Sequence, residues 1–182
     1  MKYGVILARF QPIHNGHLAL IKKAYDENDK VLLLIGSADK SNVRNPIPFN
    51  IRKELLESAL SENKMDDKCI ILGLDDLTSE KDNNIEWGFY LYANIVKHIK
   101  ETEFTIYYSD GYEIITTWFT GYILRNHVLL SLIARNSMEN GISATKVRDL
   151  IINSNDVELK KVVPTSVYDL KNTLKIYLSL YN

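Results

Sequence analysis

The chain has 182 residues, a length that suits one domain, and we expect a single domain over 1–182. Lys and Arg number 22 and Asp and Glu number 23, and this balance argues against general binding to nucleic acid or anionic membranes. Hydrophobic residues make up 46% of the chain, which excludes intrinsic disorder. Cys69 is the one cysteine, so an intrachain disulfide is excluded, as is typical of a reducing compartment.

No apolar run approaches the roughly 20 residues that a membrane-spanning helix needs. The most apolar long segment, 122–134, is interrupted by Arg125, Asn126 and His127. The apolar run after Lys2 stops before Arg9 and is too short for a secretory signal. We therefore expect a cytoplasmic protein that binds small molecules and neither nucleic acid nor membranes.

Short apolar runs, which predict buried strands, alternate along the chain with apolar stripes at helical spacing. In chain order these patterns predict a strand over 3–8, a helix with the stripe Leu18, Ile21, Ala24 and Tyr25, a strand over 31–35, a helix with the stripe Ile51, Leu55, Ala59 and Leu60, a strand over 69–74, a helix with the stripe Ile85, Phe89, Tyr92, Val96 and Ile99, and a strand over 104–108. Beyond residue 111 we expect a helix over 113–120, a strand over 127–134, a helix over 145–153 and further helices from 156.

This alternation predicts an α/β fold: a Rossmann-like doubly wound parallel sheet, with a small helical C-terminal part over about 145–182. Ligands of such sheets bind at the carboxyl ends of the strands. The loops after Ala8, Ile35, Leu74 and Tyr108 should therefore surround one crevice.

The loop after the first strand carries residues suited to an anion. The N-terminus of the following helix offers backbone N–H groups and a positive dipole end. His14 and His17 flank Gly16, so both can face one anion while the glycine admits a ligand close to the backbone. Together with Arg9 they predict a phosphate-chain site. The alternatives are two solvated histidines or a metal site, although no third ligand at suitable spacing stands out.

A second cationic helix start follows Gly141. Ser143 or Thr145 can cap this helix, and Lys146 and Arg148 occupy its first turns. Cations there oppose the helix dipole unless an anion lies between them. The other interpretation is a capped helix with solvated basic residues.

Residues 8–17, ARFQPIHNGH, resemble the GRFQPxHxGH opening of the nucleotidylyltransferase superfamily, and residues 142–148 resemble its ISxTxxR motif. The branch that resembles the chain most is that of the nicotinamide-nucleotide adenylyltransferases, of the archaeal and the bacterial Nudix-fused type. The resemblance implies that His14, His17 and Arg148 are catalytic. It also implies an ATP site made by Ala8, which replaces the usual glycine, and by Arg9, Phe10, Gly16, Ser143 and Thr145.

Two further segments bear on the acceptor of the transferred group. Residues 36–52 resemble the GSAQxSHxxxNPFTxxER segment of that branch, with Asp39 in place of Gln and Asn42 in place of His. Residues 84–87 resemble the N-x-x-W element that holds the nicotinamide ring in the same branch. The resemblance implies that the acceptor is bound by Ser37, Arg44, Arg52, Asn84 and Trp87. From the residues alone, an Asn-Pro surface turn and a core tryptophan are equally open.

The implied reaction joins ATP and nicotinamide mononucleotide (NMN) to give NAD and pyrophosphate, with Mg²⁺ on the phosphates and no protein metal ligands. The attacking phosphate is mostly ionised at pH 7, so neither a general base nor a covalent intermediate is needed. The alternatives are another acceptor (nicotinate mononucleotide, pantetheine phosphate, FMN or a polyol phosphate), a non-catalytic ATP or NAD sensor, or a tRNA-synthetase-like fragment. We also expect a homo-oligomer.

Overall fold

A computed structural model of the chain describes residues 1–79, 84–110, 113–134 and 141–181. Within these ranges the strands form one parallel sheet with the order β3-β2-β1-β4-β5. The strands are β1 (Tyr3–Ala8), β2 (Lys30–Gly36), β3 (Cys69–Leu74), β4 (Phe104–Ser109) and β5 (Val128–Ile133). The strand order runs outward from β1 in both directions, so the switch point lies between β1 and β4, and their carboxyl ends open a crevice.

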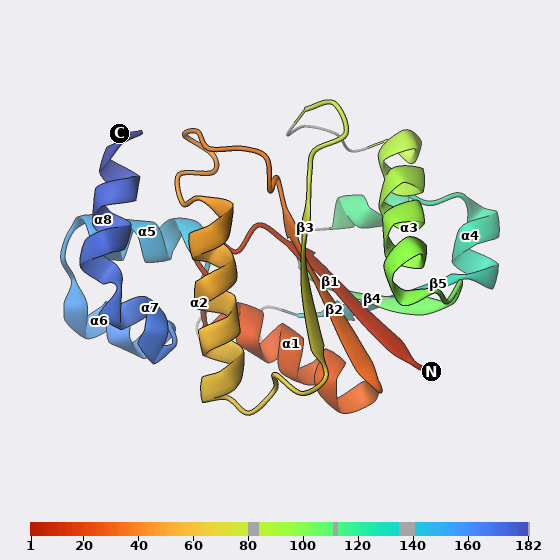
Figure 1. Ribbon diagram of the computed structural model, residues 1–182, viewed down its shortest axis with the longest axis horizontal. Coiled ribbons are helices and arrows are strands. Elements are labelled where there is room, and N and C mark those ends of the chain that lie inside the picture. The colour runs from red at the N-terminus through yellow and green to blue at the C-terminus, as the bar shows by residue number, and fades with distance from the viewer. Residues whose placement is uncertain (80–83, 111–112, 135–140, 182) are drawn as a thin grey trace.

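Helices cover both faces of this sheet, which confirms the predicted doubly wound α/β fold (Figure 1). One face carries α1 (Asn15–Glu27) and α2 (Phe49–Glu62), and the other carries α3 (Ile85–Ile99), the 3₁₀ helix η1 (Glu113–Thr117) and α4 (Gly121–Asn126). Alternate side chains of a strand point to opposite faces. In β2, Leu33 therefore joins the cluster under α1 and α2, whereas Leu32 joins the one under α3.

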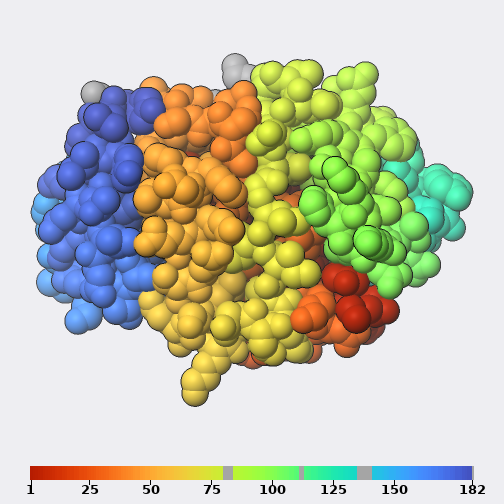
Figure 2. All heavy atoms as spheres, viewed as in Figure 1, coloured from red at the N-terminus to blue at the C-terminus, as the bar shows by residue number. Residues whose placement is uncertain are grey.

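The C-terminal part consists of α5 (Ala144–Ile152), α6 (Asp156–Val162), α7 (Thr165–Asp169) and α8 (Lys171–Ser179), next to α2 in the space-filling view (Figure 2). Its apolar side chains, such as Val147 and Leu174, belong to the same hydrophobic cluster as α1 and α2. The Glu62 carboxylate accepts hydrogen bonds from the backbone N–H groups of Thr165 and Ser166, at 2.9 and 2.8 Å. These bonds tie the end of α2 to the start of α7.

Three predicted elements need correction. The expected stripe of α3 is wrong at its start, because Ile85 and Phe89 are 48% and 51% exposed whereas Trp87 is 6% exposed. This part of α3 is apolar on several sides, so its spacing alone could not select the buried face. The single helix expected over 113–120 is instead η1, followed by a separate helix α4 that begins after Thr120.

Thr120 explains why a new helix starts there, because its side-chain oxygen accepts a hydrogen bond from the Ile123 N–H and so caps α4. A third difference concerns β3, which was expected to be buried but is an edge strand with Ile70 40% exposed. Among the described residues, none of the helices combines the length and the apolar character needed to cross a membrane.

Gly88 allows α3 to lie directly on the chain that follows η1. A Cβ atom at this position would lie 1.8 Å from the Trp118 carbonyl oxygen, which is main chain and cannot turn aside. This close approach brings Trp87 and Trp118 into an edge-to-face pair with ring centroids 6.0 Å apart. The glycine thus sets which face of α3 is buried.

We expect Gly88→Ala to lower the free energy of unfolding by at least about 2 kcal/mol, because α3 must move away from Trp118. Chemical denaturation followed by circular dichroism measures the change. Gly121→Ala is the matched control, since its Cβ would meet only the flexible Arg125 side chain, at 3.4 Å. An unchanged stability of Gly88→Ala would contradict this packing.

Candidate functional site

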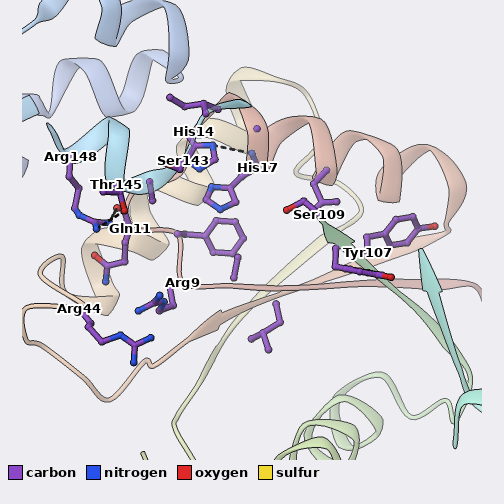
Figure 3. A pocket seen from close by; sticks show the side chains of 18 of the residues that line it. Arg9, Gln11, His14, His17, Arg44, Tyr107, Ser109, Ser143, Thr145 and Arg148 are labelled. Atoms are coloured by element: carbon purple, nitrogen blue, oxygen red, sulfur yellow. Dashed lines mark hydrogen bonds between the residues drawn. The ribbon is translucent and has the colours of Figure 1, made fainter. Parts of the chain in front are cut away.

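A cleft of about 430 Å³ opens at the carboxyl ends of β1 and β4, at the switch point of the sheet (Figure 3). Its walls come from the end of β1 and the β1–α1 loop, the first turn of α1, the β2–α2 loop (residues 37–48), the end of β4 and the start of α5. The lining residues include all nine residues expected to bind ATP or to be catalytic, namely Ala8, Arg9, Phe10, His14, Gly16, His17, Ser143, Thr145 and Arg148. The described residues of the loop after β3, 75–79 and 84, contribute no lining residue, contrary to expectation.

The two histidines belong to the start of α1. His14 is the N-cap residue, and its Nδ1 accepts a hydrogen bond from the His17 backbone N–H at 3.3 Å. The two imidazole rings stack with centroids 3.8 Å apart. A Cβ at Gly16 would lie 3.1 Å from the His14 ring and 3.1 Å from Ile142, so glycine keeps the helix start close to the opposite wall. The stacked rings therefore form one edge of the cleft.

The opposite wall is the start of α5. Ser143 is its N-cap residue and accepts a hydrogen bond from the Lys146 N–H at 3.3 Å. Arg148, one turn further, donates to the Gln11 carbonyl oxygen at 3.0 Å and to Thr145 Oγ1 at 3.2 Å. Burial, together with the nearby Arg9, lowers the pKa of Arg148. An anion in the cleft would offset both the desolvation of the Arg148 guanidinium and its repulsion by Arg9.

The charge of the lining is one-sided. Arg9, Arg44 and Arg148 come from three separate segments and lie on the same side of the cleft (Figure 3). No Asp or Glu is found among the described residues that line it. The N-termini of α1 and α5 add positive dipole ends. This arrangement suits a ligand with several negative charges, such as a polyphosphate.

Four of the five residues expected at the acceptor lie outside this cleft; Arg44 is the one that lines it. The Ser37 hydroxyl donates to Asp76 Oδ1 at 2.9 Å. Asn84 caps α3, accepting from the Trp87 N–H at 2.9 Å, and Trp87 is buried beside Trp118. The structure thus brings the expected ATP-side residues together but places these four outside the lining of the cleft.

Arg52, the fourth residue expected at the acceptor that lies outside the cleft, is fully buried and donates to three backbone carbonyl oxygens. Its Nη1 lies 2.9 Å from Arg9 O and 2.8 Å from Gly36 O, and its Nη2 lies 2.9 Å from Ser37 O. Burial and the neighbouring Arg9 lower the pKa of Arg52 to about 10, which leaves it charged at neutral pH. The guanidinium thus joins the chain segments that follow β1 and β2.

The sequence interpretation assigned no role to several lining residues. These are Gln11, Val43, Tyr107, Tyr108, Ser109 and Ile142, among others. The position of Tyr108 and Ser109 at the end of a predicted strand was a usable signal, because ligands gather at such ends. Gln11 belongs to the first motif, but its contact with Ile47, 36 residues away, left no signal in the sequence.

Cys69, the lone cysteine, lies on the edge strand β3 and does not line the cleft. Burial raises the pKa of its thiol to about 12, with the nearby Asp67 acting in the same direction. The thiolate, which is the nucleophilic form, is therefore scarce at neutral pH.

The fold and the cleft define a class: an α/β protein with a cationic cleft at the switch point of a parallel sheet. Residues 5–150 match the cytidylyltransferase-like family, and the chain belongs to that family. It is 30% identical over 176 residues to the nicotinamide-nucleotide adenylyltransferase of Thermococcus sibiricus, a match that spans 94% of this chain and 84% of the relative.

Two further matches are shorter or show the fold alone. The nicotinamide-nucleotide adenylyltransferase of Thermococcus onnurineus is 30% identical, but the match spans 63% of this chain and only 62% of that protein. The crystal structure of a bifunctional NMN adenylyltransferase/ADP ribose pyrophosphatase from Francisella tularensis, in complex with AMP and a manganese ion, superposes with a TM-score of 0.70. At 24% identity, the superposition covers 98% of this chain and 51% of that one.

We expect Arg52→Ala to lower the free energy of unfolding by about 3 to 5 kcal/mol, because three carbonyl oxygens, two of them buried, lose their donor. Urea denaturation measures the change. The exposed Arg44 provides the control, and Arg44→Ala should shift stability by less than about 0.5 kcal/mol. Equal stability of both variants would show that Arg52 does not hold these segments together.

Proposed function

We propose that the chain transfers the adenylyl group of ATP to NMN, forming NAD and pyrophosphate. One observation carries the proposal: the N-termini of α1 and α5, two stacked histidines, and Arg9 and Arg148 converge on one cleft. The nicotinamide-nucleotide adenylyltransferases of two Thermococcus species, both 30% identical to this chain, support the choice of reaction.

The ATP half of the site would bind the triphosphate between α1 and α5. The β1–α1 loop, the N-cap residue Ser143 and Thr145 in the first turn of α5 surround this space, and Arg9 lines it. His14, His17 and Arg148 would stabilise the negative charge that grows on the phosphates as pyrophosphate departs. Gly16 would let the phosphates approach the backbone of α1, where a side chain would crowd His14 and Ile142.

The chemistry asks for positioning rather than for a protein nucleophile. A phosphate monoester is mostly ionised at pH 7 and can attack the α-phosphorus directly. Cys69, a potential nucleophile, lies outside the cleft and its thiol pKa is raised to about 12. We therefore propose a single in-line displacement in which the chain aligns the two substrates and stabilises the developing charge.

The acceptor would enter beside the β2–α2 loop, where Arg44 lines the cleft and can meet the phosphate of the mononucleotide. We propose that Ser37 and Arg52 shape this side through their hydrogen bonds to Asp76 and to backbone carbonyls. Asn84 and Trp87 would form the wall nearest the nicotinamide ring, with Trp87 held in place by Trp118.

The expected Mg²⁺ fits this cleft as an ion carried by the nucleotide. The described lining residues offer cations and hydroxyls but no carboxylate, so phosphate oxygens and water would be its ligands. When bound, the ion would neutralise charge on the phosphates. The residues around it, His14 and His17 on one wall and Arg148 on the other, would then orient the same oxygens.

Pyrophosphate release from ATP and Mg²⁺, measured with a panel of acceptors, tests the proposal. We expect release with NMN and much slower release with nicotinate mononucleotide, pantetheine phosphate, FMN and glycerol phosphate. Release with only one of the others would keep the ATP half and overturn the acceptor. ATP binding without release from any acceptor would instead indicate a nucleotide sensor.

His17→Ala and Arg148→Ala should each reduce kcat about 10²- to 10³-fold, because each removes a donor to the developing charge. Circular dichroism should show that both variants remain folded. His98 in the last turn of α3 and Arg125 in α4 lie outside the cleft, so His98→Ala and Arg125→Ala serve as controls. Near-wild-type turnover of His17→Ala and Arg148→Ala would refute their assigned roles.

A further inference from the structure

Gln11 connects three segments of the chain that meet at the cleft. It lies in the β1–α1 loop, is 2% exposed, and lines the cleft. Its side-chain Nε2 donates to the Ile47 carbonyl oxygen, and its Oε1 accepts from the Ile47 N–H, both at 3.0 Å. Its own carbonyl oxygen accepts a hydrogen bond from Arg148. One residue therefore contacts the β2–α2 loop through its side chain and α5 through its main chain.

The bond pair with Ile47 closes the end of the β2–α2 loop. Ile47 is fully buried, so without Gln11 its N–H and C=O would lose their partner in a dry environment. Arg52 holds the start of the same loop through Gly36 and Ser37. Between these two anchors, Asn42 and Asn45 form the turn that carries Arg44 to the mouth of the cleft.

Arg44 and Arg148 thus depend on different atoms of Gln11. The position of Arg148 depends on the main-chain carbonyl oxygen, which every substitution keeps. The loop that carries Arg44 depends on the side-chain amide, which a substitution removes. Arg44 lies three residues before Ile47, so a shift of Ile47 moves the cation that faces the acceptor.

We propose that Gln11 is a positioning residue that aligns the acceptor with ATP by fixing the loop of Arg44 to the β1–α1 loop. This inference rests on the proposed adenylyl transfer to a mononucleotide phosphate. Gln11 acts through Ile47 and Arg44 and need not touch the reacting atoms. Displacements of about 1 Å in such an alignment cost on the order of 10²-fold in rate.

The test separates the two substrates. Gln11→Ala should raise the acceptor KM and lower kcat, reducing kcat/KM for NMN on the order of 10²-fold. The dissociation constant of a non-hydrolysable ATP analogue, measured by calorimetry, should change less than about twofold, because the Arg148 bond to the main chain remains. Equal losses for both substrates, or no loss for either, would overturn the proposal.

A second variant guards against a general structural effect. Gln11→Glu keeps the size of the side chain but turns a carboxylate toward the Ile47 carbonyl oxygen. Protonation of the carboxylate restores a donor, so the ratio of its acceptor KM to the wild-type KM at the same pH should fall as the pH falls from about 8 to about 6. Burial raises the carboxyl pKa while the nearby Arg9 and Arg148 lower it, and the ratio cancels the titration of the acceptor phosphate and of His14 and His17. Asn63→Ala is the matched control: it removes an amide bond to Ala59 O at the far end of α2 and should leave both substrate parameters unchanged.

Hydrogen exchange separates failure of this inference from failure of the proposed function. Gln11→Ala should speed amide exchange in residues 41–48 at least about tenfold and leave residues 143–152 unchanged. Unchanged exchange in 41–48 would overturn the role of Gln11 whatever the reaction. If wild-type enzyme released no pyrophosphate with NMN while exchange rose as expected, the proposed acceptor would fail and the coupling of the loops would stand.

Discussion

The cleft depends on a buried guanidinium at the point where two parallel strands end. Arg52 donates hydrogen bonds to the carbonyl oxygens of Arg9, which follows β1, of Gly36, the last residue of β2, and of Ser37, which follows β2. Parallel strands alone do not fix the paths of the loops that leave them. A planar cation with several donors can hold such loops in one arrangement, and a lysine cannot match that geometry. The site is therefore set by the core beneath it as well as by the residues that line it.

Positive charge is concentrated in this region at a cost to the protein without ligand. Arg9 lies close enough to lower the pKa of both Arg52 and Arg148, and burial acts in the same direction on each. The N-termini of α1 and α5 add positive potential to the same cleft. A polyphosphate would offset this repulsion, so binding affinity and catalytic charge stabilisation have the same source. Under the proposed function, this charge would promote transfer at phosphorus without a covalent intermediate.

The sequence predicted the parts of the fold that local pattern controls. The strand predicted over 3–8 has the observed bounds. The two phosphate motifs line the same cleft, because one comes after the end of a strand and the other at the start of a helix, and both positions could be read from the sequence. The buried face of α3 was missed, because that face is selected by Gly88 against the main chain of Trp118. The bonds of Gln11 with Ile47 and of Arg52 with three carbonyls were missed for a related reason. Each joins residues distant in sequence, and single-residue patterns carry no record of such pairs.

The central claim is that the chain aligns the two substrates, and that the acceptor phosphate rather than a group of the protein attacks phosphorus. The stereochemistry of adenylyl transfer tests this most directly, using ATP made chiral at the α-phosphorus by sulfur substitution. A single in-line displacement by the acceptor phosphate predicts inversion of configuration in the dinucleotide product. Retention would indicate two displacements and a covalent adenylyl intermediate on the protein, and would contradict the account.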